Sequence, residues 1–285
     1  MPNFRTDLAL ESALQLGIAG KNAQRSEGVR VLEYLQEGYP VTFVTVENEE
    51  GRRAIGRNIG RYITLDLQPY FLRQTHYFPR GVRCFAQHLR QLLPPLRADS
   101  CVLVAGLGNR FMACDAVGPM VIDNLLVTRH MGDPFQPVAA IATGVAGQSG
   151  MEAADLICGA AAQISPAAII VVDALCARSR NRLCATIQLS DTGLTPGSGV
   201  GNHRRPIDQK AMGVPVLAIG IPTVIGGAVL AEELTGTSAK PDHTLFVTPR
   251  DVDSRVRELG RLVGYGISSA LQPQLTVEDI TGLLG

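Results

Sequence analysis

The fold class follows most directly from the run Ala168-Ile-Ile-Val-Val172, which is followed at once by Asp173. Aliphatic residues in succession, without polar alternation, are typical of a strand that is buried on both faces of a sheet. A second such run, Cys101-Val-Leu-Val-Ala-Gly106, leads through a glycine-containing turn into a helical stretch at 116–130. Strands that alternate with helices in this way predict a mostly parallel sheet with helices on both faces, a three-layer α/β/α fold.

The same alternation continues on both sides of these two runs. Further strands are predicted at Val138-Ala-Ala-Ile-Ala142, Val216-Leu-Ala-Ile-Gly220 and Thr244-Leu-Phe-Val247. Helices are predicted at 81–93, at 151–163, where Ser149 and Glu152 are spaced as a capping box, and from Asp251 to about Leu271. The region 29–67 has strand-like patterns separated by turn residues, which predicts an N-terminal β-hairpin region as an appendage to an α/β core of about 100–285.

The composition limits the classes of function. The chain has 285 residues, 46% of them hydrophobic, so one principal domain can bury a substantial core. Its 26 basic residues are balanced by 26 acidic ones, which leaves no broad positive surface for direct binding of nucleic acid or of an anionic membrane. Residues 1–20 carry charges at Arg5, Asp7 and Glu11 in place of the apolar run of a signal peptide or membrane anchor. We therefore expect a cytoplasmic protein.

Two aspartates occupy positions where an open parallel sheet collects its ligands. Asp115 follows the loop Gly106-Leu-Gly-Asn109 after one strand, and Asp173 directly ends another. Paired carboxylates at one site can divide into a general base and a protonated partner. We assign the base to Asp115, near helix-terminal amides, and the protonated role to Asp173, although the reverse assignment fits the same pattern. A helix N-cap and a strand-end cap are the structural alternatives for the two residues.

Other polar residues give weaker signals. Asn109 fits either a ligand contact or a bond within its own loop. A dinucleotide-binding loop is disfavoured, because Phe111 replaces the third glycine of that fingerprint. The glycine-rich segment 190–205 fits the wall of a substrate cleft or a long surface turn. Its His203 could bind substrate or metal, but the five histidines form no His-x-x-x-His pair, so we expect no metal and no cofactor.

Several separated segments match one known family. They are Phe4-Arg-Thr-Asp-Leu-Ala-Leu-Glu11, Gly106-Leu-Gly-Asn109 with Asp115-Ala-Val-Gly-Pro119, Thr143-Gly-Val-Ala-Gly-Gln-Ser-Gly150, Val172-Asp-Ala-Leu-Cys-Ala-Arg-Ser179, and Ile187-Gln-Leu-Ser-Asp-Thr-Gly193 through Pro196-Gly-Ser-Gly-Val-Gly-Asn202. Together they resemble the germination protease of spore-forming bacteria over nearly the whole chain, and the glycine-rich segment 190–202 is especially specific.

The resemblance implies an endopeptidase of the spore core that degrades small acid-soluble spore proteins during germination. It implies an α/β fold similar to the hydrogenase-maturation peptidases, a homo-oligomer that is a tetramer in the family, and two catalytic aspartates that map onto Asp115 and Asp173. Polar residues within or beside the matching segments are candidates to bind the substrate: Asn109, Arg178, Ser198, Asn202 and His203.

The resemblance also implies a zymogen that removes a short N-terminal piece by cutting itself after an acidic residue. The family's substrates are cut at a site similar to Glu-(Phe or Ile)-Ala-x-Glu, and Asp7-Leu-Ala-Leu-Glu11 fits that pattern. We predict cleavage between Asp7 and Leu8, which gives a propeptide of 1–7 and a single peptidase domain of 8–285. The segment 223–243 is shorter than is usual in the family, and this difference bears on the tetramer.

Two other functions fit the same residues. One is a metal-dependent peptidase of the hydrogenase-maturation type, in which a bound cation activates water between carboxylates. The other is a non-catalytic spore protein that kept the fold and binds its partner without cutting it. The presence of both Asp115 and Asp173 at strand ends argues against the second, because a binding protein needs neither carboxylate there.

Overall fold

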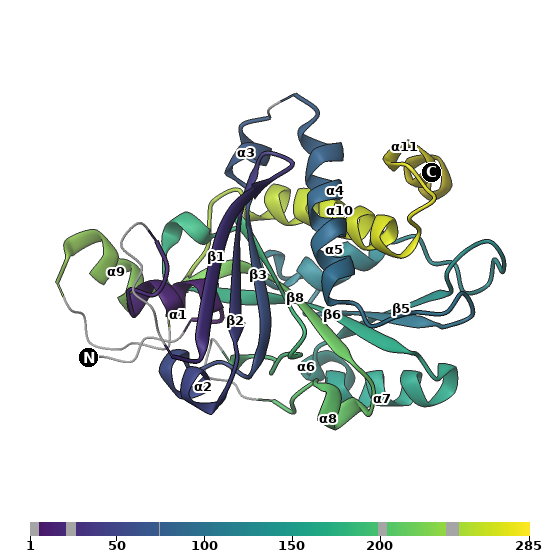
Figure 1. Ribbon diagram of the computed structural model, residues 1–285, viewed down its shortest axis with the longest axis horizontal. Helices are drawn as coiled ribbons and strands as arrows, with labels where there is room; N and C mark the ends of the chain where they lie inside the picture. The colour runs from purple at the N-terminus through teal and green to yellow at the C-terminus, as the bar shows by residue number, and fades with distance from the viewer. Residues whose placement is uncertain (1–5, 21–26, 74, 199–203, 238–244) are drawn as a thin grey trace.

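A computed structural model describes residues 6–20, 27–73, 75–198, 204–237 and 245–285 (Figure 1). Its strands form one sheet in the order β1-β2-β3-β7-β8-β6-β4-β5, and β9 pairs with β8 outside this path. The strands are β1 Val29–Gln36, β2 Tyr39–Val46, β3 Gly60–Asp66, β4 Val102–Leu107, β5 Val138–Gly144, β6 Ala168–Ala177, β7 Thr186–Ser190, β8 Val216–Gly226 and β9 Phe246–Val247.

Helices of very different length connect the strands. They are α1 Ala9–Gln15, α2 Glu49–Ile55, α3 Gln68–Phe71, α4 Tyr77–Leu92, α5 Val117–Asp123, α6 Ala146–Ser149, α7 Ala153–Ile164, α8 Gln209–Met212, α9 Gly227–Thr235, α10 Val252–Leu271 and α11 Val277–Leu284, with 3₁₀ turns η1 Ala113–Asp115 and η2 Arg180–Arg182. In the described ranges, no helix combines the length and the apolar character needed to cross a membrane.

The sheet has a parallel half and an antiparallel half. β8, β6, β4 and β5 run parallel to one another, and these strands include the aliphatic runs that the sequence predicts. β1, β2, β3 and β7 pair antiparallel, and β7 joins β8 antiparallel as well. The predicted hairpin region therefore continues the sheet through β3 and β7, and the α/β fold carries an antiparallel extension on its parallel core.

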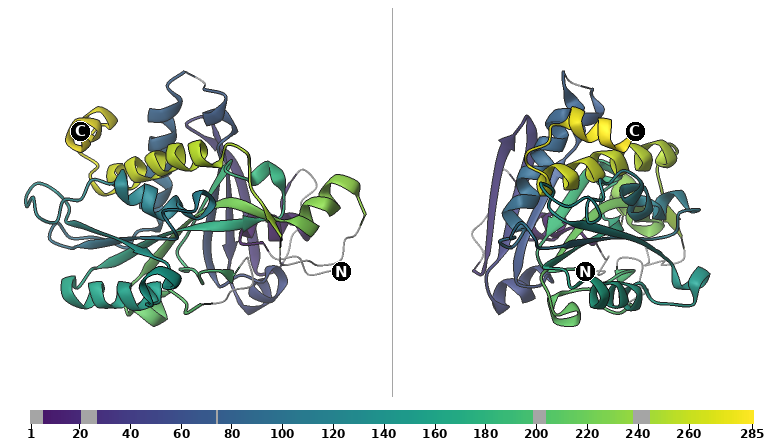
Figure 2. Two further views of the ribbon diagram at one scale, coloured as in Figure 1. Left: turned by 180° about the vertical axis from the view of Figure 1, so that it is seen from behind. Right: turned by 90° about the vertical axis from the view of Figure 1, so that its right-hand side faces the viewer.

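Helices cover both faces of this sheet, as predicted for a three-layer fold (Figures 1 and 2). On one face, α4, α5 and α10 pack over the largest hydrophobic cluster. On the other face, α7 packs on the parallel strands, and α1 and α2 pack on the antiparallel ones. Alternate residues of β4 contribute to opposite faces, with Val102 and Val104 in one cluster and Leu103 and Ala105 in the other.

Some local details differ from the sequence prediction. The capping box does not form, because α7 begins after Glu152 without a side-chain cap and the Ser149 hydroxyl instead lies near the Val145 carbonyl oxygen. The helix predicted at 116–130 is only α5, which ends at Asp123. The predicted last strand begins at Thr244, outside the described residues, and its remainder is β9, which pairs antiparallel with β8.

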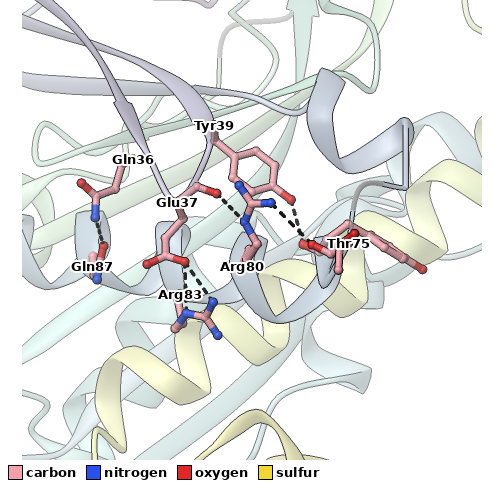
Figure 3. A network of polar contacts seen from close by, with 8 residues as sticks. Gln36, Glu37, Tyr39, Thr75, Arg80, Arg83 and Gln87 are labelled. Atoms are coloured by element: carbon pink, nitrogen blue, oxygen red, sulfur yellow. Dashed lines mark hydrogen bonds and ion pairs between the residues drawn. The ribbon is translucent and has the colours of Figure 1, made fainter.

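The turn between β1 and β2 is tied to the helical layer by polar contacts (Figure 3). Arg80 Nε donates to the Glu37 carbonyl oxygen at 2.8 Å, and the Arg83 guanidinium pairs with the Glu37 carboxylate at 3.0 Å. Gln36 Nε2 donates to Gln87 Oε1 at 2.6 Å. These contacts hold the hairpin turn against α4, and the opposite end of the antiparallel strands borders the cavity described next.

Candidate active site

The carboxyl ends of the parallel strands open into a cavity of about 630 Å³. Asp115 and Asp173 both line it, the first from the loop after β4 and the second from β6. Because β4 and β6 are direct parallel neighbours, two residues far apart in the sequence reach one site. This is the edge of the sheet at which open α/β folds bind their ligands.

Asp115 is positioned by the turn that follows β4. Gly108 has a φ of +107°, and a Cβ there would lie 2.0 Å from the Asp115 carbonyl oxygen, so glycine is required. The same turn directs the Asn109 N–H to Asp115 Oδ2, which accepts it at 2.8 Å. Burial raises the pKa of Asp115, while this N–H and the positive charge of Arg204 limit the rise.

Asp173 is the more deeply buried of the two carboxyls, with 8% of its surface exposed. Burial, and then the negative charges of Asp115 and Asp7, raise its pKa to about 8, against the effects of the Ala174 N–H, which donates to Asp173 Oδ1 at 2.9 Å, and of Arg204. At neutral pH the cavity therefore favours a protonated Asp173 beside a second carboxyl group, and two carboxyls in one site can serve as a general acid and a general base.

Neighbouring segments hold this pair in place. Thr223 Oγ1, on β8, donates to the Cys114 carbonyl oxygen at 2.6 Å, and Thr248 Oγ1 donates to the Thr223 carbonyl oxygen at 2.7 Å. On the other side of the cavity, Arg204 pairs with Glu152 at 3.2 Å. The turn that carries Asp115 is thus bonded to β8, and a guanidinium lies close enough to act on both catalytic candidates.

The N-terminal segment of the chain enters the same cavity. Asp7 lines it together with Asp115 and Asp173. The Asp7 N–H donates to the Cys176 carbonyl oxygen at 3.0 Å, and the Cys176 N–H donates back to Asp7 Oδ2 at 2.9 Å. Ser198 Oγ donates to Asp7 Oδ1 at 2.9 Å. Each oxygen of this carboxylate therefore has its own donor.

The residues after Asp7 are bound as closely. Gln188, on β7, donates from Nε2 to the Asp7 carbonyl oxygen at 3.1 Å and accepts the Ala9 N–H on Oε1 at 2.7 Å. The Glu11 carboxylate, which is 4% exposed, accepts the N–H groups of Arg178 and Ser179 at 2.8 and 2.9 Å. The segment is held at both of its acidic side chains and at the peptide groups next to the Asp7–Leu8 bond.

The predicted substrate-binding residues have different positions. Ser198 lines the cavity and binds Asp7. Asn109 is not among the lining residues; its side chain accepts the Phe111 N–H at 3.0 Å and the Gln148 amide at 2.9 Å, so it orders its own loop. The Arg178 side chain faces a second cavity of about 410 Å³, where it lies 3.9 Å from Glu232. The other two candidates, Asn202 and His203, lie outside the described residues.

Several cavity residues are not among those that the sequence prediction names. Gln188 stands between Ile187 and Leu189 in a short strand that alternates polar and apolar residues, a pattern that indicates a polar face but does not single out this side chain. The sequence gives no signal for Thr223 or Arg204. The role of Thr223 depends on the order of the strands, and that of Arg204 depends on a loop that returns to the cavity. The backbone N–H of Cys176 cannot be identified from residue types at all.

The cavity contains carboxyl and thiol groups, which are of the types that bind metal ions. Within the described ranges, there is no group of three or more His, Cys, Asp or Glu side chains that could hold a metal ion. Asp115 and Asp173 have the chemistry of metal ligands, but among the described residues they do not form, with Asp7 or another such side chain, a group that could hold a metal ion. The groups that surround them suit the binding of a peptide.

Comparison with known proteins shows the family of the chain. Residues 6–237 match the family model described as germination protease. The chain belongs to the germination protease family. A germination protease of Clostridium perfringens is 34% identical over an alignment of 331 positions, gaps included, that covers all of both chains. That of Halalkalibacterium halodurans is 38% identical over an alignment of 293 positions, which covers 98% of this chain and 77% of the relative.

A solved structure gives a weaker likeness. A NiFe hydrogenase maturation protease from Thermococcus kodakarensis aligns with 63% of this chain and 98% of its own, at 17% identity and a TM-score of 0.38. The family assignment rests on the germination proteases, and it makes the chain a peptidase of spore germination.

Proposed function

We propose that the chain is an endopeptidase that uses Asp115 and Asp173 to activate water and cuts after an acidic residue. The observation that carries this proposal is that Asp7 lines the cavity of the aspartate pair with its carboxylate bound, while backbone N–H groups bind the Glu11 carboxylate four residues later, at the second cavity. A chain segment held in this way is a substrate in place. The first bond to be cut is then Asp7–Leu8 of the chain itself.

The two carboxyls divide the work of hydrolysis. Ionised Asp115 removes a proton from water, whose oxygen attacks the carbonyl carbon of the acidic residue. Protonated Asp173 gives its proton to the leaving nitrogen as the C–N bond breaks. The products are a new carboxylic acid and a new amine, and the two aspartates have exchanged protonation states; the new acid then loses its proton to the amine or to water. The raised pKa of Asp173 supports this order of roles.

The contacts of Asp7 and Glu11 define what a second substrate would need. An acidic residue before the cut bond would be bound by Ser198 Oγ and the Cys176 N–H, as Asp7 is. A second acidic residue four positions later would be bound by the N–H groups that hold Glu11. Small acid-soluble spore proteins, the substrates that the family resemblance implies, carry this spacing, so we propose them as the substrates in the spore core.

The test is cleavage of an acid-soluble spore protein by the purified chain, with and without a chelator and beside Asp115→Asn and Asp173→Asn. We expect cleavage after acidic residues that resists the chelator and is lost in both variants. Loss of cleavage on chelation alone, restored by added metal, would establish the metal-dependent alternative. Tight binding without any cleavage under all conditions would establish the non-catalytic one.

We also propose that the chain forms a homo-oligomer, with the tetramer of the family resemblance as the expected state. Strand β1 is an edge strand and exposes Leu32 and Leu35, at 56% and 72% of their surfaces. Edge strands with apolar side chains are sites at which a second chain can pair. Multi-angle light scattering of the wild-type chain and of Leu35→Lys tests this: a monomeric wild type contradicts it.

A further inference from the structure

Gln188 touches the peptide group at which cleavage is proposed. It lies on β7 in the middle of the sheet, paired opposite Thr64 on β3 and Gly220 on β8, and only 8% of its surface is exposed. Its amide bridges the Asp7–Leu8 bond, with Nε2 on the Asp7 carbonyl oxygen and Oε1 on the Ala9 N–H. The side chain thus extends from a strand paired on both sides, and it contacts the two peptide groups that flank Leu8.

The orientation of this amide follows from its partners. A backbone N–H can only donate and a backbone carbonyl can only accept, so the oxygen must face Ala9 and the nitrogen must face Asp7. The group that meets the Asp7 carbonyl oxygen is therefore an N–H donor. A fixed donor at this position interacts more strongly with a negatively charged oxygen than with a neutral carbonyl.

We propose that Gln188 is a catalytic residue that stabilises the negative charge on the carbonyl oxygen of the acidic residue during hydrolysis. This role rests on the proposed function. When the oxygen of water bonds to the Asp7 carbonyl carbon, the carbonyl π electrons move to its oxygen and Asp115 takes the water proton. Gln188 Nε2 donates to that oxygen until the C=O bond re-forms, the C–N bond breaks and the Leu8 nitrogen takes the proton of Asp173.

Gln188 combines two contacts that substitution can separate. Gln188→Met removes both the donor and the acceptor with little change in side-chain shape. Gln188→Glu keeps an acceptor for the Ala9 N–H and so keeps the segment bound, but at neutral pH it loses the donor. When the new carboxyl is protonated in acid, its O–H can donate again.

The experiment measures the rate of self-cleavage at Asp7–Leu8 in the freshly refolded full chain, by intact-mass spectrometry, from about pH 5 to 8. Removing one such donor costs roughly 10²–10³-fold in rate, so we expect both variants to be slower by this factor at pH 7. Relative to wild type, Gln188→Glu should regain rate as the pH falls. Gln272→Met is the matched control, because Gln272 is a fully buried amide with three contacts to Gln136 and Thr128, outside the cavity.

Two results would overturn the role of Gln188. Wild-type rates in Gln188→Glu would mean that only the anchoring of Ala9 matters. Rates in Gln188→Met no lower than those in Gln272→Met would mean that the loss of any buried amide has the same effect. If Gln188→Met does not refold, Gln188→Glu and its pH dependence decide. The proposed function fails separately, if wild type leaves Asp7–Leu8 intact or if Asp115→Asn and Asp173→Asn still cut it.

Discussion

Asp173 is the residue at which burial and neighbouring charge combine most strongly. Its carboxyl has to be protonated to act as an acid, and its pKa is raised to about 8. We therefore expect kcat for peptide cleavage to fall as the pH rises through about 8, and to fall again in acid as Asp115 becomes protonated. The measurement is a pH–rate profile under saturating substrate. A rate that stays constant from pH 7 to 10 would rule out a protonated carboxyl in this step.

The same pKa predicts an effect on stability. Between pH 4 and 8 the folded chain keeps a proton on Asp173 that the unfolded chain has released, because the ordinary pKa of 3.8 is lower. The folded state binds more protons, so this group lowers the free energy of unfolding as the pH rises, by at most about 1.4 kcal/mol per pH unit. We expect Asp173→Asn to have a higher Tm than wild type at pH 8, with the difference vanishing near pH 4.

That expectation is checked by thermal unfolding of both proteins at several pH values. Asn keeps an oxygen acceptor for the Ala174 N–H, so the local backbone contact is retained. A lower Tm for Asp173→Asn at every pH would mean that the carboxyl is ionised and stabilised by its surroundings.

The sequence predicts the aspartates of this site more readily than their partners. Asp115 and Asp173 stand out in the sequence because each follows a run of apolar residues, where a charged side chain is conspicuous. Ser198 and Asp7 were named through a family resemblance, and they lie in contact. Gln188 acts across the sheet on a segment from the other end of the chain, so its role depends on β3, β7 and β8 being neighbours.

At the scale of elements, a close approach of α5 to β4 positions the loop that carries Asp115. A Cβ on Gly118 would lie 2.2 Å from the Leu107 carbonyl oxygen, so Gly118→Ala forces the helix away from the strand. We expect this variant to lose stability by several kcal/mol, the range of overpacked or strained core substitutions, and to lose most of its activity. Chemical denaturation and the cleavage assay measure the two effects.

Gly159→Ala is the control for this substitution. Gly159 is also a helical glycine, in α7, but nothing lies within 4 Å of a Cβ there. Alanine at such a position should stabilise the helix by roughly 0.5–1 kcal/mol. Equal destabilisation by the two variants would mean that the contact between α5 and β4 is not the cause.

Elements with a continuous apolar run or a long helical period were predictable, and short elements with neither were not. The apolar runs of β4 and β6 and the helical period of α4 and α10 extend over enough residues to be recognised. Strand β7 and helix α1, which carry or bind the substrate-like segment, have five and seven residues and are not among the predicted elements. Elements this short repeat a hydrophobic pattern too few times to indicate a structure.

At the scale of the whole molecule, the order of the strands creates the site. The antiparallel strands β1–β3 continue the parallel core through β7, and the N-terminal segment contacts β7 at Gln188 and β6 at Cys176. The alternation of strands and helices predicted the layers correctly. It could not predict that the sheet would extend through β7, because strand order depends on long-range pairing that no local pattern records.

The most direct test of the aspartate-pair peptidase is the intact mass and N-terminal sequence of the refolded full chain over time. We expect wild type to lose residues 1–7 and to begin at Leu8, while Asp115→Asn and Asp173→Asn keep their full mass under the same conditions. Cleavage at Asp7–Leu8 that continues in both variants, or a wild-type chain that stays whole or is cut elsewhere, would contradict the account.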